Sequence, residues 1–296
     1  MSLRKILRGT GVAIITPFAT DLSVDFEALG NVLDYNINNG VNYIVTLGTT
    51  GETPVLSSEE KKEIIHFTEK HIAGRVPMVI GMGGNDTAAV AKDLQAYPLD
   101  GAVAVLSASP YYNKPSQEGI YEHYKALAAA SPKPVILYNV PGRTGKNMNA
   151  STTLRLAQIE NIAGIKEASN DIQQVMEILK SRPENFAVIS GDDDLVLPEI
   201  ACGIDGVISV AANAFPKLFT EMVNHGLNYN FTKAVHLNNQ LLEVYKLLFA
   251  ESNPAGVKAF LFEMKLIKNC LRLPGVPLSD EFHARVKKYL ADNKVS

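Results

Sequence analysis

Short apolar segments recur along the chain, with room for one helix between each pair. They are rich in Val and Ile, and they are continuously apolar rather than alternating apolar with polar residues. This pattern is typical of strands that are covered on both faces of a parallel sheet. The segments that we predict to be strands are 12–15, 43–47, 78–80, 102–106, 135–138, 163–165, 187–189 and 206–210.

The intervals between these segments have the spacing of amphipathic helices. Apolar residues recur there at every third or fourth position, and Ser57 followed by Glu60 matches a capping box at a helix start. Alternating strands and helices predict parallel pairing, in either a doubly wound sheet or a closed barrel, and eight strands favour the barrel. The helical intervals are 26–38, 57–71, 87–97, 117–129, 151–159, 172–179 and 195–201.

Beyond the eighth predicted strand the pattern is helical only. Segments 217–225, 231–249, 254–269 and 280–292 have helical spacing, and no low-complexity linker precedes them. We therefore predict an α/β fold with two parts. Residues 1–215 would form a catalytic (β/α)8 TIM barrel, and residues 216–296 would form a C-terminal helical extension packed on it.

The charge balance and the hydropathy pattern exclude several kinds of partner. There are 28 Lys and Arg against 31 Asp and Glu, a net charge of −3, so the chain offers no broad cationic field to nucleic acid or to an anionic membrane surface. No apolar run approaches the roughly 18 residues of a membrane span, and no signal-peptide pattern opens the chain. We expect a cytoplasmic protein that binds neither nucleic acid nor membrane.

Neither a metal nor a dinucleotide is indicated by the motifs. The six His residues match no metal-ligand spacing, and the glycines at 81–84 lack the third glycine of a dinucleotide fingerprint. The run Asp192–Asp194 lacks the spacing of a calcium loop, and we expect it to be a solvated cluster at a helix start. The expected cofactor is therefore none.

Polar residues gather where the predicted strands end. In a barrel of this kind the active site lies at the carboxyl ends of the strands, so these residues are the candidate site. The segments are Gly48–Glu52, Ser109–Pro115, Tyr138–Thr144, Lys166–Glu167 and Ser190–Asp194.

Lys166 is the most informative of these residues. It directly follows an apolar segment, so it should point into the barrel mouth, where a buried amine without a full counter-charge can attack a carbonyl. The alternative is a lysine paired with a carboxylate at the barrel rim. Glu167 is a poor candidate for that carboxylate, because neighbouring residues on a strand face opposite ways. Tyr138, at the end of the adjacent strand, could transfer protons, or it could only line the pocket.

The remaining candidates are groups suited to carboxylates. Thr49 and Thr50 precede Gly51 after a strand, so their hydroxyls and the nearby backbone N–H groups could hold a small carboxylate, although a plain turn has the same pattern. Arg143 lies in a Pro-Gly loop near the mouth. Its guanidinium suits a second carboxylate, and a surface salt bridge is the ordinary alternative.

In order and spacing, four motifs resemble the dihydrodipicolinate synthase and N-acetylneuraminate lyase superfamily. The double threonine and the arginine are similar to its dihydrodipicolinate synthase branch, which opens the lysine and diaminopimelate pathway. The resemblance implies a class I aldolase-type lyase that joins pyruvate to aspartate semialdehyde through a Schiff base, without a cofactor. It also implies a homotetramer, a dimer of dimers. The motifs are Gly48–Glu52 (GTTGE), Tyr111–Pro115 (YYNKP), Tyr138–Gly145 (YNVPGRTG) and Gly164–Ser169 (GIKEAS).

The resemblance also implies a role for each matching residue. Lys166 would form the imine with pyruvate, and Tyr138 would exchange protons with it. Thr49 would link Tyr138 to Tyr112, which would reach the site of a neighbouring subunit. The substrate-binding residues would be Thr50, at the pyruvate carboxylate, Arg143, at the carboxylate of the semialdehyde, and Gly191 and Ile208, which would line the pocket.

Two other functions and one regulatory question stay open on the sequence. A sibling enzyme, such as N-acetylneuraminate lyase or another 2-keto acid aldolase, would share Lys166, and a non-catalytic binding barrel is a remote third hypothesis. Members inhibited by lysine have histidines and a glutamate where this chain has Ser58, Lys61 and Ala89. Loss of that carboxylate and gain of an ammonium predict weak or absent inhibition by lysine.

Overall fold

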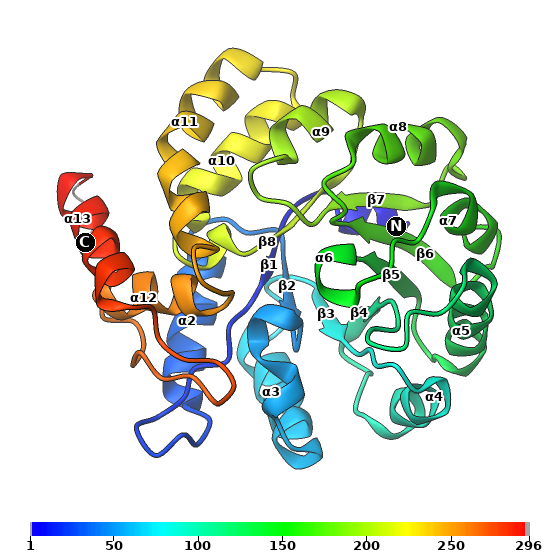
Figure 1. Ribbon diagram of the computed structural model, residues 1–296, viewed down its shortest axis with the longest axis horizontal. Helices are drawn as coiled ribbons and strands as arrows, with labels where there is room; N and C mark the ends of the chain where they lie inside the picture. Colours follow the sequence, from blue (N-terminus) through cyan, green and yellow to red (C-terminus); the bar gives the residue numbers. More distant parts are fainter. Residues whose placement is uncertain (1, 294–296) are drawn as a thin grey trace.

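The computed structural model describes residues 2–293 as a closed parallel barrel surrounded by helices (Figure 1). Each strand pairs in parallel with the next, and the first pairs with the eighth, which closes the barrel. The eight strands that the apolar segments predict are all present. They are β1 (Gly9–Ala13), β2 (Tyr43–Thr46), β3 (Met78–Gly81), β4 (Ala102–Ala108), β5 (Val135–Asn139), β6 (Ile162–Glu167), β7 (Ala187–Ser190) and β8 (Gly206–Ser209).

Helices follow the strands as the spacing predicts. The capping box at Ser57 and Glu60 is confirmed at the start of α3, where both of its hydrogen bonds are present. The helices between the strands are α2 (Phe26–Asn38), α3 (Ser58–Ile72), α4 (Thr87–Ala96), α5 (Gln117–Ala130), α6 (Pro141–Thr144), α7 (Ala150–Leu156), α8 (Ile172–Ser181) and α9 (Val196–Cys202). A short α1 (Leu3–Ile6) precedes β1.

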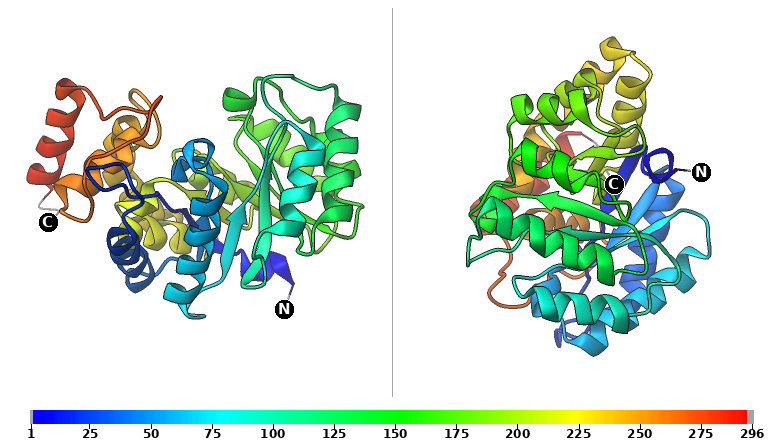
Figure 2. Two further views of the ribbon diagram at one scale, coloured as in Figure 1. Left: turned by 90° about the horizontal axis from the view of Figure 1, so that it is seen from below. Right: turned by 90° about the vertical axis from the view of Figure 1, so that its right-hand side faces the viewer.

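Four α-helices come after β8. They are α10 (Pro216–Leu227), α11 (Phe231–Leu248), α12 (Ala255–Glu263) and α13 (Asp280–Asp292). Helix α10 packs against β1 and α9, whereas α12 and α13 lie at the opposite end of the molecule from α5 (Figures 1 and 2). The chain thus passes from the barrel to the later helices through a helix that contacts both. We propose residues 216–296 as the extension, with α10 as its link to the barrel.

The two faces of the strands form separate apolar clusters. Ile136 and Tyr138 of β5 belong to a cluster inside the barrel, whereas Val135 and Leu137 pack between strands and helices. The predicted burial on both faces is therefore confirmed, and alternation along each strand decides which side chains enter the barrel.

Strand β1 begins at Gly9, three residues before the predicted start. Two of these first residues are glycines, which give no apolar signal. A Cβ on Gly11 would lie 2.1 Å from the ring of Tyr43, so the glycine makes room for a large side chain inside the barrel. The fully buried Tyr43 donates a hydrogen bond to the Val207 carbonyl at 3.2 Å.

Candidate active site

A cavity of about 960 Å³ opens at the carboxyl ends of the strands. Side chains from the segments that follow β2, β5, β6 and β7 line it, and α11 contributes to its rim. The structure therefore brings most of the predicted site residues to one place. Those that line the cavity are Thr49, Thr50, Tyr138, Arg143, Lys166 and Gly191.

Lys166 lies inside the barrel and is 5% exposed. Among residues 2–293, no carboxylate lies within ion-pair distance of its Nζ atom. Glu167 faces away, as the alternation predicts: its carboxylate accepts hydrogen bonds from Asn139 Nδ2 at 2.8 Å and from Gln174 Nε2 at 3.0 Å. The arrangement favours a reactive amine over a lysine paired at the rim.

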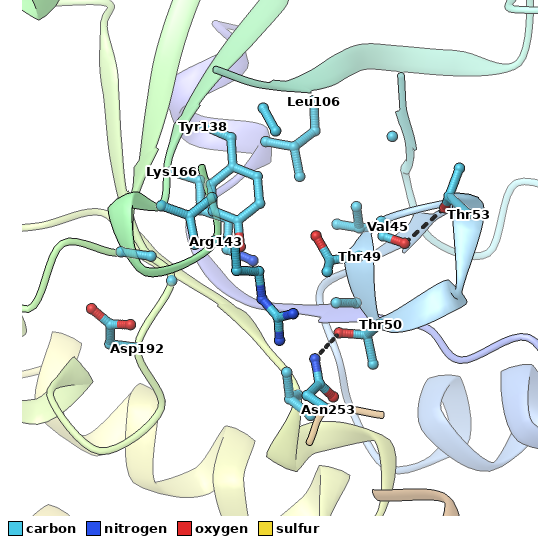
Figure 3. Close-up of a pocket in the computed structure, with 18 of the residues that line it drawn as sticks. Val45, Thr49, Thr50, Thr53, Leu106, Tyr138, Arg143, Lys166, Asp192 and Asn253 are labelled. Carbon is cyan, nitrogen blue, oxygen red and sulfur yellow. Dashed lines mark hydrogen bonds between the residues drawn. The ribbon is translucent and has the colours of Figure 1, made fainter. Parts of the chain in front are cut away.

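Tyr138 lies beside Lys166 because the two residues are register partners on adjacent strands. The Lys166 Nζ atom is 4.5 Å from the centroid of the Tyr138 ring, and Tyr138 is 8% exposed. In Figure 3 the two side chains lie together on one side of the cavity. A phenol in this position can transfer protons to and from a group bound at the amine.

Thr49 and Thr50 lie across the cavity from this pair (Figure 3). They begin a 3₁₀ turn, η1 (Thr49–Gly51), which together with its C-cap residue Glu52 we call the threonine turn. The first N–H groups of such a turn have no partner within it. The Thr50 hydroxyl accepts a hydrogen bond from Asn253 Nδ2 at 3.0 Å. Sequence reasoning missed Asn253, because no local pattern connects it to a turn 203 residues away.

Arg143 is carried by α6, the short helix that follows β5. Its guanidinium extends into the cavity between the Lys166 side and the threonine turn (Figure 3). Within the described part of the chain it forms no salt bridge. A free guanidinium at this position is available to a carboxylate of a bound molecule.

The two other predicted pocket residues differ in their positions. A Cβ on Gly191 would lie 2.8 Å from Lys166 Cε and 2.6 Å from Ala168 Cβ, so this glycine leaves room for the lysine side chain. Ile208 is fully buried in the cluster inside the barrel and is not among the described residues that line the cavity. Val210, two residues later, lines the cavity instead.

Tyr112 does not enter the cavity of its own chain. Its side chain is 89% exposed, and its backbone has a φ of 71°, in the left-handed region. The preceding residue, Tyr111, lines the cavity. The tyrosine pair is therefore split between this cavity and the molecular surface.

The expectation that Asp192–Asp194 is a solvated cluster is wrong for Asp193. That residue is 2% exposed, and its carboxylate accepts hydrogen bonds from the N–H groups of Val210 at 3.1 Å and Ala211 at 2.8 Å. Burial raises the pKa of Asp193 to about 6, although these hydrogen bonds and the charge of Lys166 both act to lower it. Asp193 thus anchors the segment after β8 beside the site.

Glu199 lies on α9, the helix that follows Asp192–Asp194, and is 1% exposed. Burial raises its pKa to about 8 from the ordinary 4.5, and the charges of nearby carboxylates add to the shift. The native state therefore keeps a proton that the unfolded chain releases, so stability falls as the pH rises from about 4.5 to about 8.

Glu199→Gln is expected to remove this loss of stability. At pH 9 the variant should be more stable than the wild type by on the order of 4 kcal/mol, and at pH 5 the two should be nearly equal. Urea unfolding at both pH values measures the difference. A difference that is the same at pH 5 and pH 9 would contradict the assignment.

Among residues 2–293, no three His, Cys, Asp or Glu side chains come together as a metal site requires. In the same residues, no helix has the length and apolar character needed to cross a bilayer.

Comparisons with known proteins agree with these motifs. Two curated relatives are 4-hydroxy-tetrahydrodipicolinate synthases. The one from Parabacteroides distasonis is 50% identical over 285 residues, with 96% of each chain covered. The one from Phocaeicola vulgatus is 50% identical over 290 residues, with 98% of each covered.

Solved structures with the same fold cover nearly the whole chain. Dihydrodipicolinate synthase from Aquifex aeolicus is 38% identical with a TM-score of 0.94, covering 98% of this chain and 99% of that one. The enzyme from Acinetobacter baumannii, solved in complex with pyruvate, is 40% identical with a TM-score of 0.95, covering 98% and 100%. The model of the dihydrodipicolinate synthetase family matches residues 6–293. The chain, with a buried lysine and tyrosine side by side at the mouth of its barrel, belongs to the dihydrodipicolinate synthetase family.

Proposed function

We propose that this enzyme condenses pyruvate with aspartate semialdehyde to 4-hydroxy-tetrahydrodipicolinate, in lysine and diaminopimelate biosynthesis. The observation that carries the proposal is the buried Lys166, which lies beside Tyr138 in the cavity and forms no ion pair within residues 2–293. The curated relatives and the pyruvate complex of the A. baumannii enzyme support this reaction and this first substrate.

The first stage is the formation of an imine. The Lys166 amine attacks the ketone carbon of pyruvate to give a carbinolamine, and the ketone oxygen leaves as water once it is protonated. Tyr138, whose ring centroid lies 4.5 Å from this amine, would supply and recover the protons. The backbone N–H groups at Thr50 would hold the pyruvate carboxylate and thereby orient the ketone toward the amine.

The second stage forms a carbon–carbon bond. The protonated imine draws electrons from the pyruvate methyl group, which loses a proton to give an enamine. The enamine carbon attacks the aldehyde carbon of the semialdehyde, and the aldehyde oxygen takes up a proton. The amine of the semialdehyde then attacks the imine carbon, closes the ring and releases Lys166. The Arg143 guanidinium, which lines the cavity, would hold the carboxylate of the semialdehyde.

The sibling aldolase and the binding barrel are tested by one experiment. The enzyme is treated with borohydride in the presence of pyruvate, the modified peptide is mapped by mass spectrometry, and turnover with aspartate semialdehyde is measured in a coupled assay. We expect an adduct on Lys166 together with turnover. An adduct without turnover would favour another 2-keto acid aldolase, and no adduct would refute the imine mechanism.

We also propose a homotetramer built as a dimer of dimers, in which Tyr112 completes the site of the neighbouring subunit. The support is the exposed Tyr112 side chain, which points away from its own cavity. Thr49 would then relay protons between Tyr138 and the partner's Tyr112.

Subunit mixing tests the shared site. Lys166→Ala and Tyr112→Phe variants should each be impaired, but a mixed dimer contains one site with an intact Lys166 and an intact Tyr112 from the other subunit. We therefore expect activity to reappear when the two variants are dissociated and reassembled together. Activity equal to the sum of the separate variants would show that each chain supplies its own Tyr112.

Lysine is expected to inhibit this enzyme weakly or not at all. Lys61 lines the cavity mouth, where its ammonium repels a cationic effector, and neither Ser58 nor Ala89 supplies the missing carboxylate. At about 1 mM lysine, which corresponds to a binding free energy of about −4 kcal/mol, less than half of the activity should be lost. Half-maximal inhibition below that concentration would contradict the prediction. Lys61→Glu is the variant expected to increase sensitivity.

A further inference from the structure

Glu52 closes the threonine turn in a backbone conformation that it does not favour by itself. It ends η1 and begins a second 3₁₀ turn, η2 (Thr53–Val55), with a φ of 53° in the left-handed region. Residues with a Cβ rarely adopt this conformation, so surrounding contacts must hold it in place.

Those contacts come from the C-terminal extension. The Glu52 side chain is buried, and its Oε1 atom lies 2.5 Å from Lys258 Nζ on α12. Its Oε2 atom accepts a hydrogen bond from the Arg272 N–H at 3.1 Å. Both partners follow β8 in the sequence by about fifty residues or more, so the extension reaches back over the barrel to hold this one carboxylate.

The buried ammonium of Lys258 also needs the carboxylate of Glu52 as its counter-charge. The lysine is 0% exposed, and its ammonium also donates to the Cys270 carbonyl at 2.9 Å and lies 4.3 Å from the centroid of the Phe18 ring. Burial lowers the pKa of Lys258, and the charge of Glu52 opposes that shift. An ammonium buried without its carboxylate would be costly, so the pair restricts Glu52 to this position.

A second connection joins the extension to the same turn. Asn253, in the turn that leads into α12, donates a hydrogen bond to the Thr50 hydroxyl at 3.0 Å (Figure 3). Residues of the segment 253–272 thus contact both ends of the turn. Asn253 forms a hydrogen bond with Thr50, and Lys258 forms an ion pair with Glu52.

We infer that the C-terminal extension fixes the geometry of the threonine turn, and that Lys258 and Glu52 are positioning residues for pyruvate binding. This inference rests on the proposed function, because it takes the turn to bind the pyruvate carboxylate. A role in stability alone is a poor account of the pair, since apolar residues of similar volume can replace a buried ion pair at little cost in stability.

The test compares Lys258→Met and the double variant Glu52→Met/Lys258→Met with the wild type. The readout is the pyruvate concentration that gives half of the borohydride-trapped adduct on Lys166, which needs neither the aldehyde nor turnover. We expect this concentration to rise at least about tenfold in both variants, while kcat at saturating pyruvate changes much less. The double variant should also regain most of the melting temperature that Lys258→Met loses.

Arg182→Met is the matched control. Its partner is Asp205, in an ion pair with side chains 9% and 5% exposed, and this pair lies at the amino end of β8, away from the cavity. Arg182→Met breaks this ion pair, and the variant should have a lower melting temperature but an unchanged half-saturating pyruvate concentration.

Three results decide the inference. The inference is overturned if Lys258→Met has the same half-saturating pyruvate concentration as the wild type. It is also overturned if the double variant regains both the melting temperature and the half-saturating pyruvate concentration of the wild type. In either case the ion pair would only stabilise the fold. If Lys258→Met does not fold, Asn253→Leu replaces it, with an expected rise of about fivefold from one lost hydrogen bond, and no rise overturns the inference. Absence of an adduct in the wild type is a different result, which refutes the proposed function itself.

Discussion

Lys166→Ala is expected to lower kcat by at least about 10⁴-fold, because removing a covalent nucleophile eliminates the pathway and not merely one stabilising contact. The pyruvate adduct should disappear completely, since no other described lysine lies beside Tyr138 in the cavity. The coupled assay with aspartate semialdehyde measures the first effect, and borohydride trapping measures the second.

The fold should survive this substitution. Lys166 is buried and forms no ion pair within residues 2–293, so its removal leaves no orphaned carboxylate. We expect a melting temperature close to that of the wild type, which separates lost chemistry from lost structure. Lys180→Ala, at an exposed position on the helix after β6, is the control and should retain activity. Full turnover by Lys166→Ala would leave the imine mechanism without support.

Tyr138→Phe is expected to lower kcat by about 10²–10⁴-fold, the usual contribution of general acid–base catalysis. The substitution keeps the ring that packs against Lys166 and removes only the hydroxyl. The imine should still form, but more slowly, so that adduct accumulates over minutes while turnover is nearly lost. Rapid-quench trapping at fixed pyruvate, beside the steady-state assay, separates the two effects.

Tyr111→Phe is the matched control for this prediction, because Tyr111 also lines the cavity but is 42% exposed and is not the register partner of Lys166. Its activity should stay close to that of the wild type. If Tyr138→Phe behaves like this control, the phenol only lines the pocket, and the protons must travel by another group.

The strands and most helices of this fold follow from local patterns. Apolar segments located all eight strands, and helical spacing reproduced the bounds of α2. The helical spacing predicted that α12 extends to residue 269, but the helix ends at Glu263. Two residues later, Lys265 has a φ of 64°, in the left-handed region, and no glycine or proline marks this helix end in the sequence. The helical spacing also missed α6, which is too short to show periodicity.

The position of the site was also accessible from the sequence. Lys166 and Tyr138 come at the ends of apolar segments that form strands. Because side chains alternate between the two faces of a strand, the direction of each side chain follows from the sequence. The same rule placed Glu167 outside the barrel, where Asn139 and Gln174 bind it.

What the sequence determined by itself is therefore the barrel, the end of it at which the cavity opens, and the residues that face inward, because short-range periodicity governs all three. The tertiary structure alone decided that Asp193 is buried, that Ile208 is packed in the cluster inside the barrel, and that Asn253 and Lys258 contact the threonine turn. These last contacts join residues more than 200 positions apart. They depend on how the C-terminal helices pack against the barrel, and no local pattern of residues encodes that packing.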